Sequence, residues 1–412
     1  MRPCLRFSRL AVAVSILACV SLVRAQPTIT NLGTFPSGTY SLARGVSSDG
    51  SVVVGQANTA SGNRVFRWTS AGGLQNLGTL PGASYSHGYG VSGDGLTVVG
   101  RSGSGSMYHA FRWTSASGTM QDLGVLPGEP VSEAFGADEQ GSAVVGGGGI
   151  FSNDHAFRWI AGLMEDLGAP PGGTGSKAYA ASADGSVVVG RGFTPAGDRA
   201  FRWTSATGMQ SLGTLPGWTN SIASSVSADG NVIVGCNYAV PTGEIAFRWT
   251  SSEGMHEFGA LPGAVSSNAN GVSGDGSVIA GGVGYGNNNF HAFLWTSYLG
   301  MRDLHVYLPA LGVDLTGWVL AGAAAVSADG SAVIGNGTFN GQCRGWIVTG
   351  LPTGCIGDLD NDDSVGLSDV AQLITHLGSA GPVYADGDLD SDGDIDLRDF
   401  AVQQNAFGTT CQ

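Results

Sequence analysis

The stretch ASADGSVVVGRGFTPAGDRAFRWTSATGMQSLGTLPG, residues 181–217, contains three short phrases that recur along the chain. An SxDG phrase, an FRWT phrase and an LGxLP phrase each appear seven times, in intact or degenerate form. A period of this length indicates a repeat architecture in which each copy forms one supersecondary unit. The phrase tryptophans are spaced by 45, 46, 44, 46, 46 and 51 residues, at Trp68, Trp113, Trp159, Trp203, Trp249, Trp295 and Trp346.

One repeat has the pattern of four short β-strands. Segments of the GVS and SVVVG type flank an Asp-Gly pair, which indicates a hairpin. The AFRWT segment predicts a third strand with Phe and Trp on one face and Arg on the other, and the segment before LGxLP predicts a fourth. Four strands in about 45 residues is the size of one propeller blade. We therefore predict a mainly β fold, with residues 26–350 forming a seven-bladed β-propeller.

The order of the phrases predicts how the ring closes. The chain after residue 25 begins with an LGTFP phrase, and the last repeat has no clear copy of it after Trp346. A strand around Thr30 to Phe35 is therefore expected to complete the seventh blade, which removes the open edges of the first and last sheets. The alternative is an open solenoid, which needs polar caps at both ends.

The repeats resemble the HAF family of extracellular repeats, named after a His-Ala-Phe triplet. This triplet occurs at residues 109–111, 155–157 and 291–293, and residues 311–330 resemble the closing repeat of that family. The resemblance covers about residues 30–350. It implies an exported repeat protein and brings no established activity.

Residues 1–25 have the pattern of a signal peptide. Arg2, Arg6 and Arg9 precede an apolar run from Leu10 to Val20, which is too short to span a bilayer. Small residues before Gln26 fit the cleavage rule, so we predict a secreted or cell-surface protein. The alternative is a lipoprotein box ending at Cys19, which anchors the protein through that cysteine. No other apolar run is long enough for a membrane span.

The charge is concentrated in the tail. The formal net charge is −14, and residues 355–412 contain twelve Asp and one Arg, so they contribute −11. A chain with this balance is not expected to bind nucleic acid or an anionic membrane surface. The propeller segment is close to neutral.

The acidic tail contains two copies of a calcium-loop pattern, which begin at Asp358 and Asp388. Residues at loop positions 1, 3, 5, 7, 9 and 12 ligate Ca²⁺ in such loops, with position 7 ligating through its backbone carbonyl. In the second copy these positions hold Asp388, Asp390, Asp392, Asp394, Asp396 and Asp399. In the first copy positions 1, 3, 5, 7 and 12 hold Asp358, Asp360, Asp362, Ser364 and Asp369. We expect the second loop to bind more tightly, because Gly366 gives the first loop no side chain at position 9 and Asp363 replaces its turn glycine. A solvated acidic segment is the alternative.

Each loop precedes a helical pattern, which after the first loop places Val370, Leu373, Ile374 and Leu377 on one face. Two such loop-helix units with Asp at position 12 resemble a type I dockerin over residues 355–411, after a short linker at 351–354. The resemblance implies a cohesin partner. The contact dyad of that family is replaced here by Leu367-Ser368 and Leu397-Arg398, so another cell-envelope protein is the alternative partner.

Four cysteines remain after signal cleavage, and they allow three pairings. Because paired loop-helix units bring their ends together, we predict a Cys355–Cys411 disulfide that closes the tail. The pairing of Cys236 and Cys343 is left open.

The sequence indicates no catalytic constellation. We interpret the FRWT tryptophans as core between blades rather than as sugar-stacking groups, and the HAF histidines have no sequence-evident partner for metal or catalytic work. No acid pair interrupts the repeats, and no G-x-S-x-G, H-E-x-x-H or P-loop motif is present. We therefore predict a non-catalytic binding or scaffold propeller tethered by its calcium-binding tail. The alternative is a component of an extracellular polysaccharide-degrading assembly, with a glycan bound on the propeller.

Overall fold

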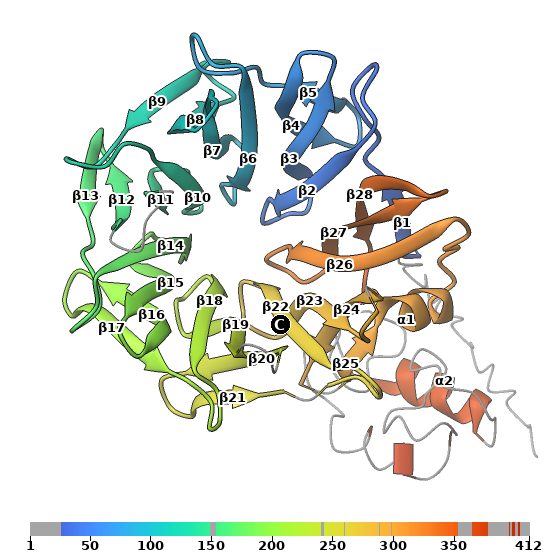
Figure 1. Cartoon of the computed structure of the whole chain (residues 1–412). Helices are drawn as coiled ribbons and strands as arrows, with labels where there is room; N and C mark the ends of the chain where they lie inside the picture. The colour runs from blue at the N-terminus through green and yellow to red at the C-terminus, as the bar shows by residue number, and fades with distance from the viewer. Residues whose placement is uncertain are drawn as a thin grey trace, which may run out of the picture.

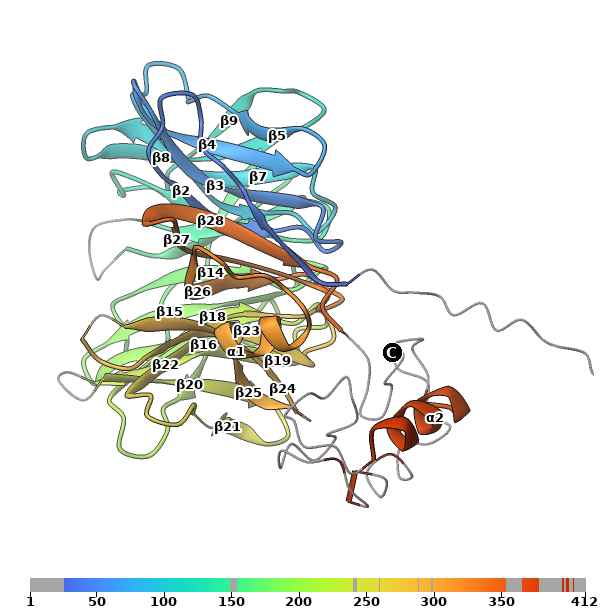
Figure 2. The ribbon, with the colours of Figure 1, turned by 90° about the vertical axis from the view of Figure 1, so that its right-hand side faces the viewer.

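The computed structural model describes residues 26–148, 154–239, 243–258, 260–287, 289–297, 299–352, 365–377, 395, 398, 399 and 403. These residues form seven antiparallel sheets of four strands each, arranged as blades around a common axis (Figure 1). The predicted seven-bladed β-propeller is confirmed. Seen from the side, the blades make a flat disc (Figure 2). Two helices occur within the described residues, α1 (Leu304–Ala310) and α2 (Leu367–His376).

Each blade contributes one strand to each of four concentric positions. The innermost strands are β2 (Ser41–Val46), β6 (Tyr85–Val91), β10 (Glu133–Ala137), β14 (Gly175–Ala181), β18 (Asn220–Val226), β22 (Ser266–Val272) and β26 (Trp318–Val326). The second strands are β3 (Val52–Thr59), β7 (Thr97–Ser104), β11 (Ala143–Gly147), β15 (Val187–Thr194), β19 (Val232–Ala239), β23 (Val278–Gly284) and β27 (Ala332–Phe339). The third strands are β4 (Gly62–Thr69), β8 (Met107–Thr114), β12 (Ala156–Ile160), β16 (Gly197–Thr204), β20 (Gly243–Thr250), β24 (Phe290–Thr296) and β28 (Gln342–Thr349). The outermost strands are β5 (Gly73–Asn76), β9 (Met120–Gly124), β13 (Leu163–Asp166), β17 (Gly208–Gly213), β21 (Gly254–Glu257), β25 (Gly300–Asp303) and β1 (Thr28–Asn31).

The SxDG phrase forms the turn between the first two strands of a blade. In blade 1 the Ser47 hydroxyl donates to the Asp49 carboxylate at 2.6 Å and accepts the Val52 N–H at 2.9 Å. Gly50 has φ +70°, and a Cβ there comes within 2.7 Å of the Ala332 Cβ in the neighbouring blade. Glycine is therefore required both by the turn and by the close approach of two blades.

Backbone hydrogen bonds join these turns around the entire ring. One bond of 2.8–3.0 Å connects each blade to the next. The N–H groups of Ser48, Asp94, Glu139, Ala183, Ala228, Gly274 and Ala328 donate, in that order, to the carbonyls of Gly93, Glu139, Ala183, Ala228, Gly274, Ala328 and Ser48. The last bond links blade 7 to blade 1, so the belt is closed.

The FRWT phrase fills the spaces between blades, as predicted. Its first six phenylalanines are fully buried, at Phe66, Phe111, Phe157, Phe201, Phe247 and Phe293. Trp113 is 3% exposed and Trp159 is 8% exposed, while Trp249 and Trp295 are partly buried. The phrase arginine reaches the turn of the next blade, where the Arg112 Nε–H donates to the Gly141 carbonyl at 2.9 Å. Each repeat therefore needs a neighbour on both sides.

The N-terminal strand closes the ring, and the open-solenoid alternative is wrong. Strand β1 pairs with β28, with Thr28 opposite Thr349 and Asn31 opposite Trp346. Figure 1 shows the first strand of the chain beside the last blade. The strand ends at Asn31 rather than continuing to residue 35, because the Asn31 side chain accepts the Gly33 N–H at 2.9 Å and Gly33 turns the chain with φ +79°.

A side chain reinforces the contact between blades 7 and 1. Asn336 on β27 accepts the Ala43 N–H at 2.8 Å and donates to the Ala43 carbonyl at 2.9 Å. We call this two-bond contact the Asn336 latch. Ala43 is fully buried, so its peptide groups depend on this amide.

The long last spacing of the repeat has a structural cause. Helix α1 lies between β25 and β26 and contacts β24, β25 and β26. It occupies the place where other repeats have only a turn, and its buried residues Leu304 and Leu308 join the core between blades 6 and 7.

Candidate functional site

A cavity of about 560 Å³ lies on the propeller axis and is lined by all seven innermost strands. Each of these strands contains a β-bulge at the same position, where one residue is skipped by the pairing with the second strand. A bulge redirects the side chain of the extra residue. The redirected residues all line the cavity, and they are Arg44, Tyr89, Phe135, Tyr179, Ser224, Asn270 and Ala324.

The two ends of the channel differ in composition. Every innermost strand runs toward an SxDG turn, so the hydrogen-bonded belt lies at one end. We use the term channel mouth for the other end of the channel in blades 1–5. It is formed by the bulge residues and the residues that precede them in the innermost strands. It also includes the parts of β7, β15 and β19 that pair with those preceding residues. The residue after each VVVG-like phrase lies toward this same end of its own blade, and unlike the core positions it differs in every blade except for a repeated Arg and Gly: Gln56, Arg101, Gly147, Arg191, Cys236, Gly282 and Asn336.

Aromatic rings form a continuous row across the channel mouth. Tyr85 and His87 lie 5.1 Å apart between ring centroids, and His87 and Tyr89 lie 6.3 Å apart. Tyr89 stacks on Phe135 at 5.1 Å with a 26° interplanar angle, and Phe135 meets Tyr179 edge-on at 5.3 Å. All five side chains are half-buried. We call these five residues of blades 2, 3 and 4 the aromatic row.

A buried carboxylate beside the aromatic row holds two cations. Glu133 is 6% exposed, lies 3.3 Å from the Arg101 guanidinium and 3.8 Å from the Lys177 ammonium, and accepts from the Tyr108 hydroxyl at 3.3 Å. Burial and the Glu133 charge raise the pKa of Tyr108 to about 12. Burial lowers the pKa of Lys177, and Glu133 opposes this shift. Lys177 is also the only lysine of the chain.

His87 is neutral at physiological pH. Burial lowers its pKa to about 4, and the charges of Arg101 and Arg44 act in the same direction. The histidine is therefore a neutral aromatic surface that forms part of the row, and its Nε2 lies 3.2 Å from the Asn63 amide nitrogen.

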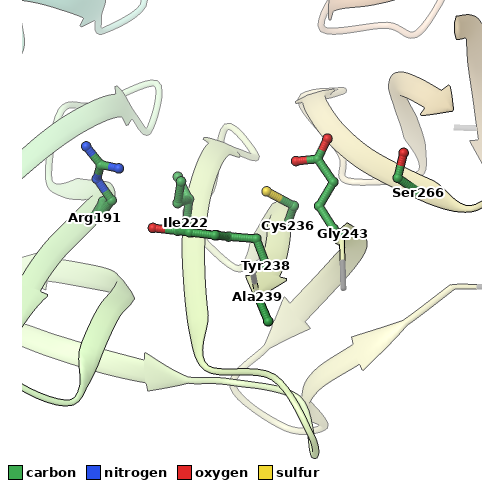
Figure 3. A pocket seen from close by; sticks show the side chains of 8 residues that line it. Arg191, Ile222, Cys236, Tyr238, Ala239, Gly243 and Ser266 are labelled. Atoms are coloured by element: carbon green, nitrogen blue, oxygen red, sulfur yellow. The ribbon is translucent and has the colours of Figure 1, made fainter. Parts of the chain in front are cut away.

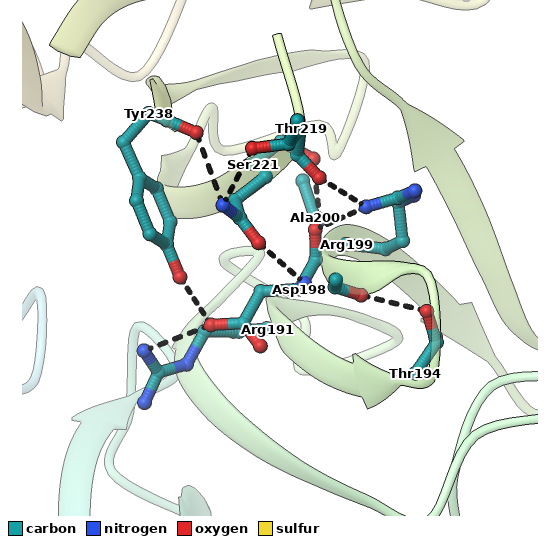
Figure 4. Close-up of polar contacts among 10 residues, drawn as sticks. Arg191, Thr194, Asp198, Arg199, Ala200, Thr219, Ser221 and Tyr238 are labelled. Carbon is teal, nitrogen blue, oxygen red and sulfur yellow. Dashed lines mark hydrogen bonds and ion pairs between the residues drawn. The ribbon is translucent and has the colours of Figure 1, made fainter. Parts of the chain in front are cut away.

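A second pocket of about 550 Å³ opens beside blades 4, 5 and 6, and its lining includes Arg191, Cys236 and Tyr238 (Figure 3). Figure 4 shows that the Tyr238 hydroxyl and the Arg191 guanidinium both contact Asp198, the latter at 3.3 Å. The Arg191 guanidinium also lies 4.7 Å from the Phe193 ring. Burial raises the pKa of Cys236 to about 12, so this thiol is protonated and is not a nucleophile.

The HAF histidines have a structural role. Each pairs through Nδ1 with an aspartate of the neighbouring outermost strand, at 2.6–3.0 Å. The same pair recurs in three blades and ties the third strand to the fourth. The pairs are His109–Asp122, His155–Asp166 and His291–Asp303.

In blade 6 a third residue joins this pair, and the cluster of His291, Asp303 and His305 has the composition of a metal site. Its hydrogen bonds do not fit one. The Leu320 N–H donates to His305 Nε2 at 2.9 Å, so Nδ1 of His305 carries the proton and donates to Asp303 at 3.3 Å. A neutral imidazole bonded in this way has no lone pair left for a metal. Burial raises the pKa of Asp303, but the hydrogen bonds from His305 and His291 outweigh it and lower the pKa to about 2.

The structure describes only part of the predicted calcium module. Helix α2 follows the first loop as predicted, although Leu373 is buried while Ile374 and Leu377 are 58% and 48% exposed. Asp369 and Asp399, at position 12 of the two loops, are both fully buried. The other predicted ligands lie outside the described residues: Asp358, Asp360, Asp362, Ser364, Asp388, Asp390, Asp392, Asp394 and Asp396.

Further sequence predictions also fall outside the described residues. These predictions are the signal peptide at residues 1–25, with the lipoprotein alternative at Cys19, and the disulfide between Cys355 and Cys411. Of the described cysteines, Cys236 is a buried free thiol and Cys343 an exposed one. Neither described helix is long and apolar enough to cross a membrane.

Comparison with known proteins gives a likeness of fold. No protein-family model and no curated protein matches the chain. Oligogalacturonate lyase from Vibrio parahaemolyticus is 10% identical, with a TM-score of 0.53 over 78% of this chain and 93% of its own. An oligogalacturonate lyase in complex with manganese is 12% identical, with a TM-score of 0.53 over 78% of this chain and 92% of its own. TolB from Acinetobacter baumannii is 11% identical with a TM-score of 0.41, and the matched region is 64% of this chain and 62% of that protein. The fold therefore places the chain in the class of β-propeller proteins.

Proposed function

We propose that the protein is a secreted, non-catalytic propeller that binds a saccharide at the channel mouth and is tethered through its calcium-binding tail. The aromatic row carries this proposal. Sugar rings pack their apolar faces on aromatic side chains, and ligand sites combine such surfaces with a few convergent polar groups. The row supplies five adjoining rings beside Arg101, Lys177 and Glu133.

The fold comparison supports the same ligand class. Two oligogalacturonate lyases share this architecture across most of their length. Their name describes an oligosaccharide substrate, which makes an oligosaccharide the first ligand to test here.

A second candidate function is catalysis within a polysaccharide-degrading assembly. Lys177 favours it, because a half-buried lysine with a lowered pKa beside a buried carboxylate is a common arrangement in active sites. We favour binding, because Lys177 is held by the Glu133 charge and the Cys236 thiol is protonated.

An oligosaccharide array followed by a chain-cleavage assay separates the two functions. We expect binding without release of new reducing ends or unsaturated products. Tyr89→Ala and Tyr179→Ala are expected to weaken binding at least about tenfold, as removal of a central aromatic contact does in other interfaces. Trp318→Ala is the matched control, since Trp318 packs on Phe339 in blade 7 away from the row. Product formation establishes the catalytic alternative, and unchanged affinity in both tyrosine variants contradicts the proposed site.

The calcium part of the proposal is supported by the two position-12 aspartates. Burial of a carboxylate is costly unless a cation or hydrogen bonds compensate for the lost solvation. Asp369 and Asp399 are both fully buried and occupy the same position in the two loops, in a segment with a charge of −11, and the Gly366 N–H donates to Asp369 at 2.7 Å. A divalent cation would neutralise this charge and contribute folding energy to a module with few apolar residues.

The tether has its own tests. A pull-down from the secreting cell's envelope, with and without calcium, tests whether a cohesin-like or another envelope protein is retained. Peptide mapping under non-reducing conditions tests the disulfide, and recovery of Cys355 linked to Cys236 or Cys343 refutes it.

A further inference from the structure

Two cationic side chains face each other across paired strands at the channel mouth. Lys177 on β14 lies directly opposite Arg191 on β15, and Arg101 on β7 lies opposite the neutral His87 on β6. Like charges in opposite positions destabilise a sheet. Consistent with this, Arg191 adds to the effect of burial in lowering the pKa of Lys177. The site therefore contains a repulsion that an external anion would relieve.

The internal carboxylates compensate for part of this charge. Glu133 pairs with Arg101 and Lys177, and Asp198 pairs with Arg191. Asp154 attracts Lys177 less strongly than Glu133 does, and Glu244 accepts from the Asn268 amide at 3.1 Å. Two carboxylates therefore make direct ion pairs with the cations of the mouth, which are Arg44, Arg101, Lys177 and Arg191.

Two of the arginines also have an unused hydrogen-bond donor. Within the described residues, Nε of Arg101 and Nε of Arg191 are buried and have no hydrogen-bond partner. Buried donors are almost always paired in folded proteins, so an unpaired one requires an explanation. A guanidinium that rotates to bind an external carboxylate in a two-bond arrangement uses Nε and one terminal nitrogen together. The two arginines are thus suited to a carboxylate ligand.

We propose that the channel mouth selects acidic oligosaccharides, whose uronate carboxylates bind Arg101, Lys177 and Arg191 while the sugar rings pack on the aromatic row. This proposal rests on the proposed saccharide binding and adds the charge of the ligand. The cations and the row are adjacent, since the Arg101 guanidinium lies 5.9 Å from the Tyr89 ring and the Lys177 ammonium 5.5 Å from the Phe135 ring. A ligand with alternating ring faces and carboxylates satisfies both sets of groups.

The single lysine allows a direct test on the unmodified full-length protein. An amine-reactive reagent has one lysine target, Lys177, whose side chain is 15% exposed. The modification rate is followed by peptide mass spectrometry against a lysine-containing reference peptide. Oligogalacturonate is expected to slow modification at least about tenfold at saturation. Its methyl ester, which has the same rings without the charge, and polyglutamate, which has the charge without the rings, are expected to have little effect.

Titration calorimetry of variants provides the second measurement. Lys177→Gln and Arg191→Gln each remove one charge-assisted contact, and we expect them to weaken oligogalacturonate binding about ten- to a hundredfold. Arg248→Gln is the matched control, because Arg248 pairs with the exposed Glu253 toward the other end of its blade. Affinity for oligogalacturonate should also fall as salt is raised, because salt screens the attraction between the charges.

The outcomes separate this proposal from the saccharide proposal. Equal protection and equal affinity for the acid and its methyl ester refute charge selection and leave saccharide binding intact. Protection by polyglutamate equal to that by oligogalacturonate refutes recognition of the sugar. If neither oligosaccharide protects Lys177 or binds, both proposals are refuted. If a charge variant fails to fold, as judged by circular dichroism, the labelling of the wild-type protein decides.

Discussion

Replacing Asn336 with Ala tests how the ring is held closed. Ala43 is fully buried in blade 1, and both of its hydrogen-bonding backbone groups are bonded by the Asn336 amide of blade 7. A buried polar group that loses its partner costs about 1–3 kcal/mol. Because Asn336 itself is only half-buried, water can replace part of this bonding. We therefore expect Asn336→Ala to lower the free energy of unfolding by about 2 kcal/mol, the middle of that range.

Asn336→Asp separates the two bonds of the latch. The carboxylate still accepts the Ala43 N–H but places an oxygen opposite the Ala43 carbonyl, where the amide donated at 2.9 Å. This variant should be at least as destabilised as the alanine variant at neutral pH. It should regain stability in mild acid, because the protonated carboxyl group can donate.

Urea unfolding followed by tryptophan fluorescence measures both effects. Gln75 is exposed, and Gln75→Ala is the control. This substitution should change the free energy of unfolding by less than about 0.5 kcal/mol. Hydrogen exchange of the β1 and β28 amides should rise in the latch variants only. If Asn336→Ala is as stable as the control and these amides remain protected, the latch does not contribute to closure and the reasoning is wrong.

Three further predictions concern the closing strand, His87 and the calcium loops. Deletion of residues 26–36 removes β1 and exposes the edge of β28, so a broader thermal transition and aggregation are expected; a truncated protein that melts as sharply as the parent contradicts this. His87 has a folded pKa of about 4 below an ordinary value of 6.5, so its unfolded form gains the proton first and stability falls as pH decreases from 6.5 to 4. The His87→Asn variant should lose about 1–2 kcal/mol less than the wild type over this range, allowing for solvent screening, and parallel curves of stability against pH refute the assignment. In calorimetric titration of chelator-treated full-length protein, Asp399→Ala should abolish the tighter calcium event and Asp358→Ala only the weaker one; a tight event that survives Asp399→Ala means the loops are misassigned.

Much of the fold could be predicted from the sequence because its causes are local and repeated. The Asp-Gly turns, the alternation in FRWT and the seven-fold period each act within about 45 residues. Repetition then determines the core, since a face that recurs in every copy must pack on the next copy. The LGTFP phrase near the N-terminus has no counterpart after Trp346, and this indicated that an N-terminal strand closes the ring. The pairing of β1 with β28 confirms this prediction.

The sequence also contained signals for the site that pattern analysis passed over. The residue after each VVVG-like phrase varies while its neighbours repeat, and the only lysine of the chain is Lys177. These signals indicate where the repeat is free to differ, but they do not show that the variable positions meet.

The tertiary structure alone decided the candidate site. Arg44, Tyr89, Phe135 and Tyr179 are separated by about 45 residues each, and only closure of the ring brings them to one cavity. Their direction depends on a bulge in each innermost strand, which shifts the register by one residue and turns an otherwise inter-blade position toward the axis. The period of the sequence thus determined which residues form the blades, while strand register and ring closure determined which side chains face one another across the channel.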